Sequence, residues 1–287
     1  MELVEKLKIK YSYLDILSKI IVWMVFCFIL PYLINTTLFL FNIKSFSLVE
    51  YFHVSADLSE LIFKPWSLLT YGFFHAGLWH LAGNMLILYY SGRIVLDLYG
   101  KNKFLKIFFI GLLFGSLTYL LCYNIFPVFS GLKPPMIGAS AGAMAMFIFL
   151  TAHNPNLTFR LVFIDVKIIY IAGFLIFSDI IQIPVGNSGG HLAHLGGAFW
   201  GYYFNKQLQV GKNPGEWIIK FYNYFNSFFN VKPKVKQVYK NYNVKSNPSR
   251  KVDQKKIDEI LDKISKSGYE SLSKSEKDFL FKNSDND

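Results

Sequence analysis

The chain has 287 residues, of which 53% are hydrophobic, 18% aromatic and 17% charged, and its mean hydropathy is +0.31. A soluble domain carries about 25% charged residues, so this composition argues against a soluble enzyme and favours a membrane protein. The net charge of +11 lies mainly in the Lys-rich ends, residues 1–18 and 206–287, without a basic recognition motif, which argues against a nucleic-acid partner.

The first long apolar run, residues 20–41, predicts a transmembrane helix. It is too long for the hydrophobic core of a signal peptide and has no small-residue cleavage site, so we expect it to be retained. The polar residues before it, 1–19, form an expected cytoplasmic segment. The two cysteines, Cys27 and Cys122, both fall in apolar stretches, which argues against a disulfide framework.

Six apolar stretches approach the roughly 20 residues that a helix needs to cross a bilayer. The last three are shorter, which is tolerated where neighbouring helices rather than lipid cover the helix ends. We therefore expect an all-α polytopic membrane protein with a six-helix bundle over residues 20–206. The predicted spans are 20–41, 68–92, 104–124, 138–153, 168–183 and 190–206.

The loops alternate between basic and nearly neutral, and this alternation predicts the orientation. Lys and Arg are frequent before the first span, after the second and fourth, and beyond the sixth, whereas the other loops hold only Lys44, Lys64 and Lys133. Both termini are therefore predicted to be cytoplasmic. Residues 42–67 form a long, aromatic-rich connection that we expect to lie partly in the outer interface.

The polar tail combines several patterns. Residues 207–254 contain an amphipathic stretch at 217–229, which indicates an interfacial helix, and then a Lys- and Asn-rich linker. Residues 255–287 show two short helical patterns that break at Gly268, with a Ser-x-x-Glu capping box after the break. We expect a small C-terminal cytoplasmic helical module without visible chemistry of its own.

One serine has an unusual setting, in Gly138-Ala139-Ser140-Ala141-Gly142 within the fourth predicted span. In a soluble α/β enzyme a Gly-x-Ser-x-Gly motif marks a nucleophile between strand and helix, but this chain shows no such alternation. The simpler alternative is helix packing, because Gly138 and Gly142 form a GxxxG pair that lets membrane helices approach closely. Alone, the motif leaves both interpretations open.

A histidine in the sixth predicted span favours the nucleophile. His194 precedes a second small-residue frame, Gly197 and Gly201, that lets its helix press against a neighbour. An imidazole can take the serine proton as general base and return it to the leaving amine as general acid. His191, three residues earlier, is a competing base that lacks the following glycine frame and ranks second.

Polar residues in the second predicted span supply a third element. His80 and Asn84 are four residues apart and share one face of a helix. Their side chains could donate hydrogen bonds to the oxyanion that develops during acyl transfer. His75 is as easily explained by a polar cluster that holds the bundle together.

Other intramembrane chemistries lack their residues. No His-Glu-x-x-His motif supplies zinc ligands, and His191 and His194 have no carboxylate near them in the sequence. No pair of aspartates in the spans indicates an aspartyl protease, so we expect neither metal nor cofactor. Asp179, in the fifth span, could orient a histidine, but hydration at the interface or a bond to a neighbouring helix is the favoured interpretation. No inverted repeat typical of a transporter is visible.

Together, these motifs resemble in order and spacing those of the rhomboid intramembrane serine proteases. The resemblance covers about residues 60–205 and includes Pro65 to Tyr71, which are similar to the family's approach to its second span. The tail in turn resembles a module attached to Bacteroidetes-type bacterial rhomboids. The motifs that carry the family resemblance are His75…His80…Asn84, GASAG at 138–142 and AHLGGAFWG at 193–201.

The resemblance implies a Ser–His dyad without an aspartate, in a water-filled cavity that opens to the outer side. By that resemblance, Ser140 is the nucleophile and His194 the base. His80 and Asn84 match the oxyanion side chains, which the Ser140 backbone N–H supplements. His75 matches a position that supports them through a hydrogen bond.

Further positions either match the family or depart from it. Gly197 and Gly201 match the close-packing glycines of the histidine helix. Met144 stands where an aromatic residue often packs under the histidine, so we expect altered dyad geometry rather than loss of chemistry. Trp66-Ser67 replaces a common Trp-Arg, which leaves the first external loop without the family's anchor.

We therefore predict an intramembrane serine endopeptidase that cleaves transmembrane helices of membrane-protein substrates near the outer interface. The alternative is a non-catalytic rhomboid-like protein that binds client transmembrane helices. The predicted location is a bacterial inner membrane. The expected partners are transmembrane substrates and the lipid bilayer, and the sequence leaves the oligomeric state open.

Overall fold

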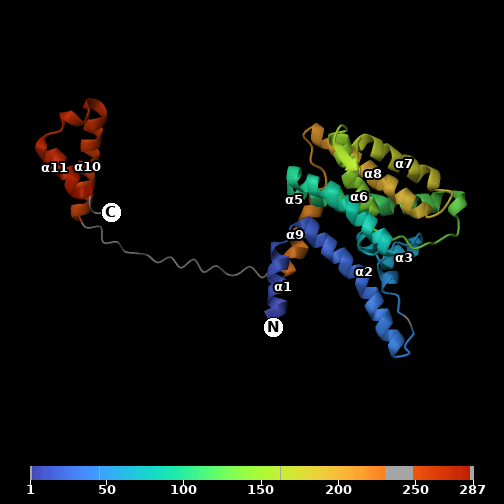
Figure 1. The fold of residues 1–287 in the computed structure, drawn as a ribbon. Helices are drawn as coiled ribbons and strands as arrows, with labels where there is room; N and C mark the ends of the chain where they lie inside the picture. The colour runs from blue at the N-terminus through green and yellow to red at the C-terminus, as the bar shows by residue number, and fades with distance from the viewer. Residues whose placement is uncertain (1, 45, 162, 230–247, 285–287) are drawn as a thin grey trace. The chain divides into compact units, whose positions relative to one another are not determined.

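The structure is a computed structural model that describes residues 2–44, 46–161, 163–229 and 248–284 (Figure 1). It divides the chain into two compact units, Met1–Val231 and Lys232–Asp287, which are described separately. The part of the predicted Lys- and Asn-rich linker that ends at residue 247 lies outside the described residues.

Two helices open the first unit, α1 (Glu2–Tyr13) and α2 (Ile16–Leu40). Asp15 is the N-cap of α2, because its carboxylate accepts a hydrogen bond from the Ser18 amide at 2.7 Å. The cap explains why the helix begins four residues before the predicted span. Only three residues of α2 are buried: Leu17, Ile20 and Met24.

An apolar helix with so much exposed surface is typical of a membrane span rather than of a soluble core. Among the described residues, α2 and α5 (Leu78–Ile125) are long and apolar enough to cross a bilayer. α6 (Ser140–His153) and α7 (Ile168–Gln182) are shorter apolar helices.

Helix α5 contains most of the second predicted span and all of the third. Its course changes at Gly100, whose φ of 75° lies in the left-handed region that glycine tolerates. Two helical segments therefore meet at this residue, one before it and one after it. This turn coincides with the basic loop that the sequence predicted between the two spans.

The segment before α5 corrects the predicted start of the second span. Where a helix was expected, α4 (Ser67–Thr70) and the 3₁₀ turn η2 (Tyr71–Phe73) lead into extended chain. Tertiary hydrogen bonding replaces the helix here, because the Tyr71 carbonyl accepts the Gly138 amide at 3.0 Å. His75 therefore precedes the helix that carries the other two polar residues of its motif.

Helix α6 is the centre of the bundle and packs mainly against α5 and α8 (Ser188–Gln209) (Figure 1). Small residues permit this approach: a Cβ atom added to Gly111 of α5 would lie 2.5 Å from the Ala145 Cβ. Helix α7 packs against α8 and less against α6, and most of its surface is exposed. Its buried residues are Ile168, Ala172 and Asp179.

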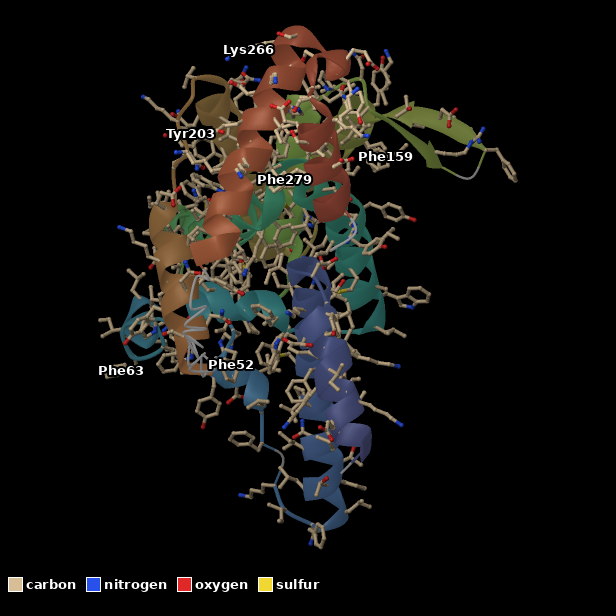
Figure 2. The ribbon with its side chains drawn as sticks, turned by 90° about the vertical axis from the view of Figure 1, so that its left-hand side faces the viewer. Phe52, Phe63, Phe159, Tyr203, Lys266 and Phe279 are labelled. Atoms are coloured by element: carbon tan, nitrogen blue, oxygen red, sulfur yellow. The ribbon has the colours of Figure 1, made fainter. Side chains whose placement is uncertain are left out.

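The chain is mostly helical, as the all-α expectation has it, and departs from it in the short β-hairpin that joins α6 to α7. β1 (Thr158–Leu161) pairs antiparallel with β2 (Ile164–Lys167), and Phe159 lies opposite Val166. The β-branched and aromatic residues of this stretch suit a strand, whereas its Arg160 and Lys167 predict only a basic loop. Phe159 is labelled on the hairpin in Figure 2.

The connection between α2 and α4 is tied to the bundle by hydrogen bonds. It contains the 3₁₀ turn η1 (Leu48–Tyr51) and α3 (Leu58–Phe63), whose last residue is labelled in Figure 2. Trp66 Nε1 donates to the Tyr51 carbonyl at 2.8 Å, so this loop is anchored without the family's Trp-Arg. Further anchors are the Val54–Met136 bridge and the Lys133–Asp57 ion pair.

Helix α9 (Glu216–Phe229) is amphipathic, as the sequence predicted, and uses its two faces differently. Ile218 and Ile219 are buried in the core of the bundle, whereas Trp217 and Phe221 are exposed. The first turn is fixed by the buried Lys106 ammonium of α5, which bonds to Glu216 and to Asn213.

The second unit contains α10 (Pro248–Ser267), the 3₁₀ turn η4 (Tyr269–Ser271) and α11 (Lys274–Ser284). Gly268 ends α10 with a φ of 75°, at the predicted break. Ser273 and Glu276 form the predicted capping box, since the Ser273 amide donates to Glu276 at 2.7 Å and its hydroxyl accepts the Glu276 amide at 3.4 Å. Figure 2 labels Lys266 on α10 and Phe279 on α11.

Candidate functional site

Ser140 is the first residue of α6, directly after a turn that requires glycine. Gly138 has a φ of +125°, and a Cβ atom there would lie 2.7 Å from Nε2 of His80. Any side chain at this position would therefore be strained and would collide with the imidazole. The turn leaves Ser140 half-buried at the N-terminus of the helix.

Helix α8 packs directly onto the first turn of α6. A Cβ atom on Gly197 would lie 2.0 Å from the carbonyl oxygen of Ala141, the residue after Ser140. His194 is one turn before Gly197 and so lies on the same side of α8. The glycine contact therefore lays the turn of α8 that bears His194 beside the start of α6.

The second motif reaches the same place from α5 and the segment before it. The Ala139 amide donates to His75 Nε2 at 3.4 Å, and the rings of His75 and His80 lie 5.2 Å apart, edge to face. His80 Nε2 lies 2.7 Å from the Cβ position of Gly138, two residues before Ser140. Residues from three segments thus gather around the start of α6.

A free hydrogen-bond donor lies in this group. Asn84 is buried, its Nδ2 has no partner among the described residues, and it lies 3.7 Å from the Cβ position of Gly138. The first amides of α6, beginning at Ser140, have no acceptor within the helix. Unpaired donors beside a helix N-terminus form a setting that stabilises negative charge on a substrate oxygen.

An acidic residue that the sequence did not favour for catalysis contacts the expected base. Asp179 Oδ1 lies 2.8 Å from Nδ1 of His194 and 2.8 Å from Nδ1 of His191. Of the two favoured interpretations, the bond to a neighbouring helix is confirmed, and its partners are the two histidines. The sequence held a signal for the contact between Asp179 and His191. In two antiparallel helices joined by a short turn, residues at equal sequence separations from the turn lie side by side. Asp179 is six residues before residue 185 and His191 is six residues after it.

This cluster also forms a possible set of metal ligands that the sequence did not predict. In the sequence no carboxylate lies near His191-x-x-His194, whereas the fold supplies Asp179 from α7. Within the described part of the chain, Asp179, His191 and His194 form a group whose possible ligand atoms all lie within 4.8 Å of one another.

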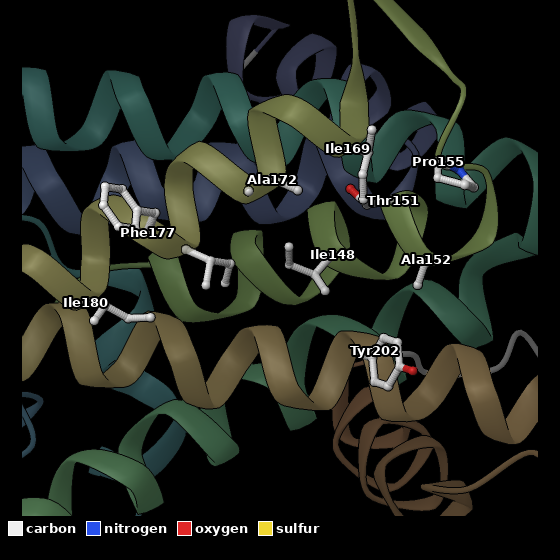
Figure 3. A pocket seen from close by; sticks show the side chains of 11 residues that line it. Ile148, Thr151, Ala152, Pro155, Ile169, Ala172, Phe177, Ile180 and Tyr202 are labelled. Carbon is white, nitrogen blue, oxygen red and sulfur yellow. The ribbon is translucent and has the colours of Figure 1, made fainter.

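Two cavities lie near these helices. An apolar groove of about 510 Å³ runs between α6, α7 and α8, lined by residues that include Ile148, Phe177 and Tyr202 (Figure 3). Of its lining residues on α6, Ile148 is nearest to Ser140 in sequence, eight residues or about 12 Å along a helix at about 1.5 Å per residue. On α7 the groove reaches Phe177 and Ile180, which flank Asp179 in the sequence. A smaller cavity of about 210 Å³ adjoins His75 and Asn35, and both have a buried polar atom without a partner among the described residues. Ordered water there would satisfy both atoms.

Comparison with known proteins gives two matches to families. The rhomboid domain family matches residues 63–208, and a family of unknown function, DUF6576, matches residues 241–286. The first match covers 146 of 287 residues, just over half of the chain.

Several curated proteins are similar over the same region. RHOMBOID-like protein 12, mitochondrial, from Arabidopsis thaliana is 32% identical over 46% of this chain and 43% of its own length. Presenilin-associated rhomboid-like protein, mitochondrial, from Rattus norvegicus is 25% identical over 55% of this chain and 41% of its own. Rhomboid-related protein 1 from Caenorhabditis elegans is 34% identical over 49% and 39%, respectively. The match spans less than half the length of each of these relatives.

These names correct the predicted location. The prediction of a bacterial inner membrane is wrong, because the relatives from plant and rat are named as mitochondrial proteins and point to a mitochondrial membrane instead. The basic loops could not have decided this, since charge asymmetry orients helices without identifying the membrane. The relatives named above are all eukaryotic, and the Bacteroidetes-type subtype is not supported by them.

Proposed function

The chain belongs to the rhomboid family, and from that premise we propose that it is an intramembrane serine endopeptidase with Ser140 as nucleophile and His194 as general base. The observation that carries the proposal is the convergence at the start of α6. Ser140 begins α6, the turn of α8 that bears His194 is packed beside it, and Asn84 contributes a buried amide donor with no partner among the described residues. Acyl transfer needs these three groups.

The reaction follows from the roles of these groups. Ser140 Oγ attacks the carbonyl carbon of a substrate peptide while His194 accepts the hydroxyl proton. The oxyanion that forms accepts hydrogen bonds from Asn84, His80 and the Ser140 amide. His194 then protonates the leaving amine, and water hydrolyses the acyl-enzyme with the same residue as base.

The remaining motif residues support this geometry. His75 accepts the Ala139 amide and so steadies the residue before the nucleophile. Gly138 admits the His80 ring, and Gly142 faces Phe108 of α5 so closely that a Cβ atom would lie 2.7 Å from its ring. Gly197 and Gly201 hold α8 against α6.

The proposed topology has six spans. They are α2, the two halves of α5 on either side of Gly100, and α6, α7 and α8. The Lys-rich loops then lie on one side together with both termini, as the positive charges indicate. Substrates would be transmembrane segments of other proteins, cleaved near the opposite interface. The names of the relatives favour a mitochondrial membrane, and the Bacteroidetes-type subtype stays a prediction that rests on the tail alone.

A cleavage assay with the purified protein tests the proposal. We expect Ser140→Ala and His194→Ala to abolish cleavage of a membrane-embedded model substrate, whereas Ser130→Ala, at an exposed serine of an external loop, leaves it intact. A fluorophosphonate probe should label the wild type and not Ser140→Ala. Substrate binding without cleavage or labelling would favour the alternative, a non-catalytic protein that binds client helices.

A further inference from the structure

A buried carboxylate lies beside the proposed base. The Asp179 side chain is 7% exposed, and its Oδ2 has no partner within the described part of the chain. Burying a carboxylate costs free energy unless the charge is paired. The hydrogen bonds to two imidazoles therefore offset the cost of burying Asp179 in the bundle. The dyad expected for the family makes no use of such a residue.

We propose that Asp179 is a positioning residue that holds the His194 imidazole in the tautomer and orientation needed for proton transfer with Ser140. The inference rests on the proposed function, because it takes His194 as the base. Asp179 itself touches neither the substrate nor the nucleophile in this role.

The hydrogen bond decides which ring nitrogen is free. An ionised carboxylate only accepts hydrogen bonds, so Nδ1 of His194 carries the proton that is directed at Asp179 Oδ1, 2.8 Å away. Nε2 of the neutral ring then has the lone pair that can accept a proton. The ring is also fixed in rotation, because Nδ1 must point to α7. A dyad without this contact would have to populate the productive tautomer and rotamer unaided.

The same contact favours the charged intermediate. When His194 takes the Ser140 proton it becomes an imidazolium, and a carboxylate 2.8 Å from its Nδ1 stabilises that charge. The stabilisation is larger here than in water, because the Asp179 side chain is almost wholly removed from solvent.

The sequence made His191 a competing candidate for the base, whereas in this arrangement it has another role. Its Nδ1 also donates to Asp179 Oδ1, and the rings of His191 and His194 are 5.8 Å apart and nearly perpendicular. A second donor on the same oxygen fixes the carboxylate between two turns of α8. His191 therefore supports Asp179 rather than replacing His194.

Distances favour hydrogen bonding over a metal centre. Ligands bound about 2.0–2.1 Å from a tetrahedral zinc ion lie about 3.4 Å from one another. Both imidazole nitrogens lie only 2.8 Å from the same carboxylate oxygen, which is the separation of an N–H donor and a charged acceptor. The cluster is therefore assigned to proton positioning.

The test is steady-state kinetics of Asp179→Asn in the full chain, with a membrane-embedded fluorogenic substrate. The amide keeps the size of the side chain but removes its charge, and it no longer enforces one tautomer. We expect kcat to fall on the order of 10²-fold with an unchanged KM, a smaller loss than the about 10⁴-fold known for soluble Ser-His-Asp enzymes. Asp179→Glu should recover part of kcat. His191→Asn should lower kcat less than Asp179→Asn does.

Two controls separate positioning from simple stabilisation. Asp165→Asn makes the same change at an exposed aspartate of β2 and should leave kcat unchanged. Thermal unfolding and size-exclusion chromatography give the folded fraction to which each kcat is referred. A loss explained entirely by that fraction, or a kcat equal to the wild type, would overturn the role of Asp179 while cleavage still depended on Ser140. Cleavage that persists in Ser140→Ala would instead refute the proposed function and this inference with it.

Discussion

Replacing Gly197 with alanine should separate α8 from α6 next to the proposed nucleophile. The added Cβ would lie 2.0 Å from the Ala141 carbonyl oxygen, whereas ordinary contacts begin at 3.4 Å. The two backbones must therefore part by about 1.4 Å. The obstacle is backbone and not a flexible side chain, and a change of rotamer therefore cannot relieve it. The shift falls on the helix turn that places His194.

The expected loss of activity exceeds the loss of stability. Overpacking costs about 1–3 kcal/mol, offset in part by the roughly 0.5–1 kcal/mol that alanine gains over glycine in a helix. A misplacement of about 1 Å at reacting groups costs on the order of 10²-fold in rate. Gly197→Ala should therefore remain folded, melt a few degrees lower and lose on the order of 10²-fold in kcat.

Two matched glycine-to-alanine variants show whether the loss of activity depends on where the added methyl group collides. Gly173→Ala, in α7, meets nothing within 4 Å and should keep both activity and stability. Gly201→Ala makes a similar collision with Ala145 O, at 2.2 Å, but one turn further from Ser140. It should destabilise about as much and lose less activity. Cleavage rates and thermal melting of the three proteins decide the matter, and wild-type activity in Gly197→Ala would refute the packing argument.

Three other predictions concern separate contacts. Asn84→Ala should lower kcat on the order of 10²–10³-fold with little change in melting temperature, because Nδ2 has no partner to lose among the described residues; a matching fall in stability would contradict this. Glu216→Gln deprives the buried Lys106 ammonium of its counter-charge and should cost about 1–3 kcal/mol of unfolding free energy, less than for a fully buried pair because Glu216 is exposed. Thermal melting measures that cost, and adding Lys106→Met should restore it. Hydrogen bonds from the Ser273 amide, the Lys263 ammonium and the Ser273 hydroxyl lower the pKa of Glu276 from 4.5 to about 2. The contribution of the ionised carboxylate at the start of α11 is therefore present above pH 4.5 and lost as the pH falls toward 2. Amide exchange at that turn, relative to intrinsic rates, should rise over this range, and Glu276→Gln should remove the dependence.

Local signals in the sequence were enough to locate most helices. Apolar runs of the right length marked α2, α6, α7 and α8, because burial in lipid or in a bundle selects apolar residues throughout such helices. Glycine and the Ser-x-x-Glu pattern likewise marked the break at Gly268 and the cap of α11, since both signals act within four residues.

One error arose where a distant part of the chain competes for the backbone, and another where a local signal was not used. The residues before α5 are as apolar as those of a predicted span. The Tyr71 carbonyl nevertheless accepts a hydrogen bond from the Gly138 amide, and α5 begins only at Leu78. Gly138, the partner of Tyr71, lies 67 residues away and is outside any local window. The hairpin between α6 and α7 is a different case, because Thr158 pairs with Lys167 only nine residues later and its β-branched and aromatic residues are a local signal.

The residues alone determined which groups could do chemistry: a serine between glycines, a histidine before a glycine frame, and an amide four residues from an imidazole. They determined this because reactive side chains are few in an apolar chain and each one is conspicuous. Tertiary structure decided which of them meet. Asp179 and the two histidines of α8 lie 12 and 15 residues apart in sequence, and only the antiparallel packing of α7 on α8 brings a buried carboxylate to 2.8 Å from both rings.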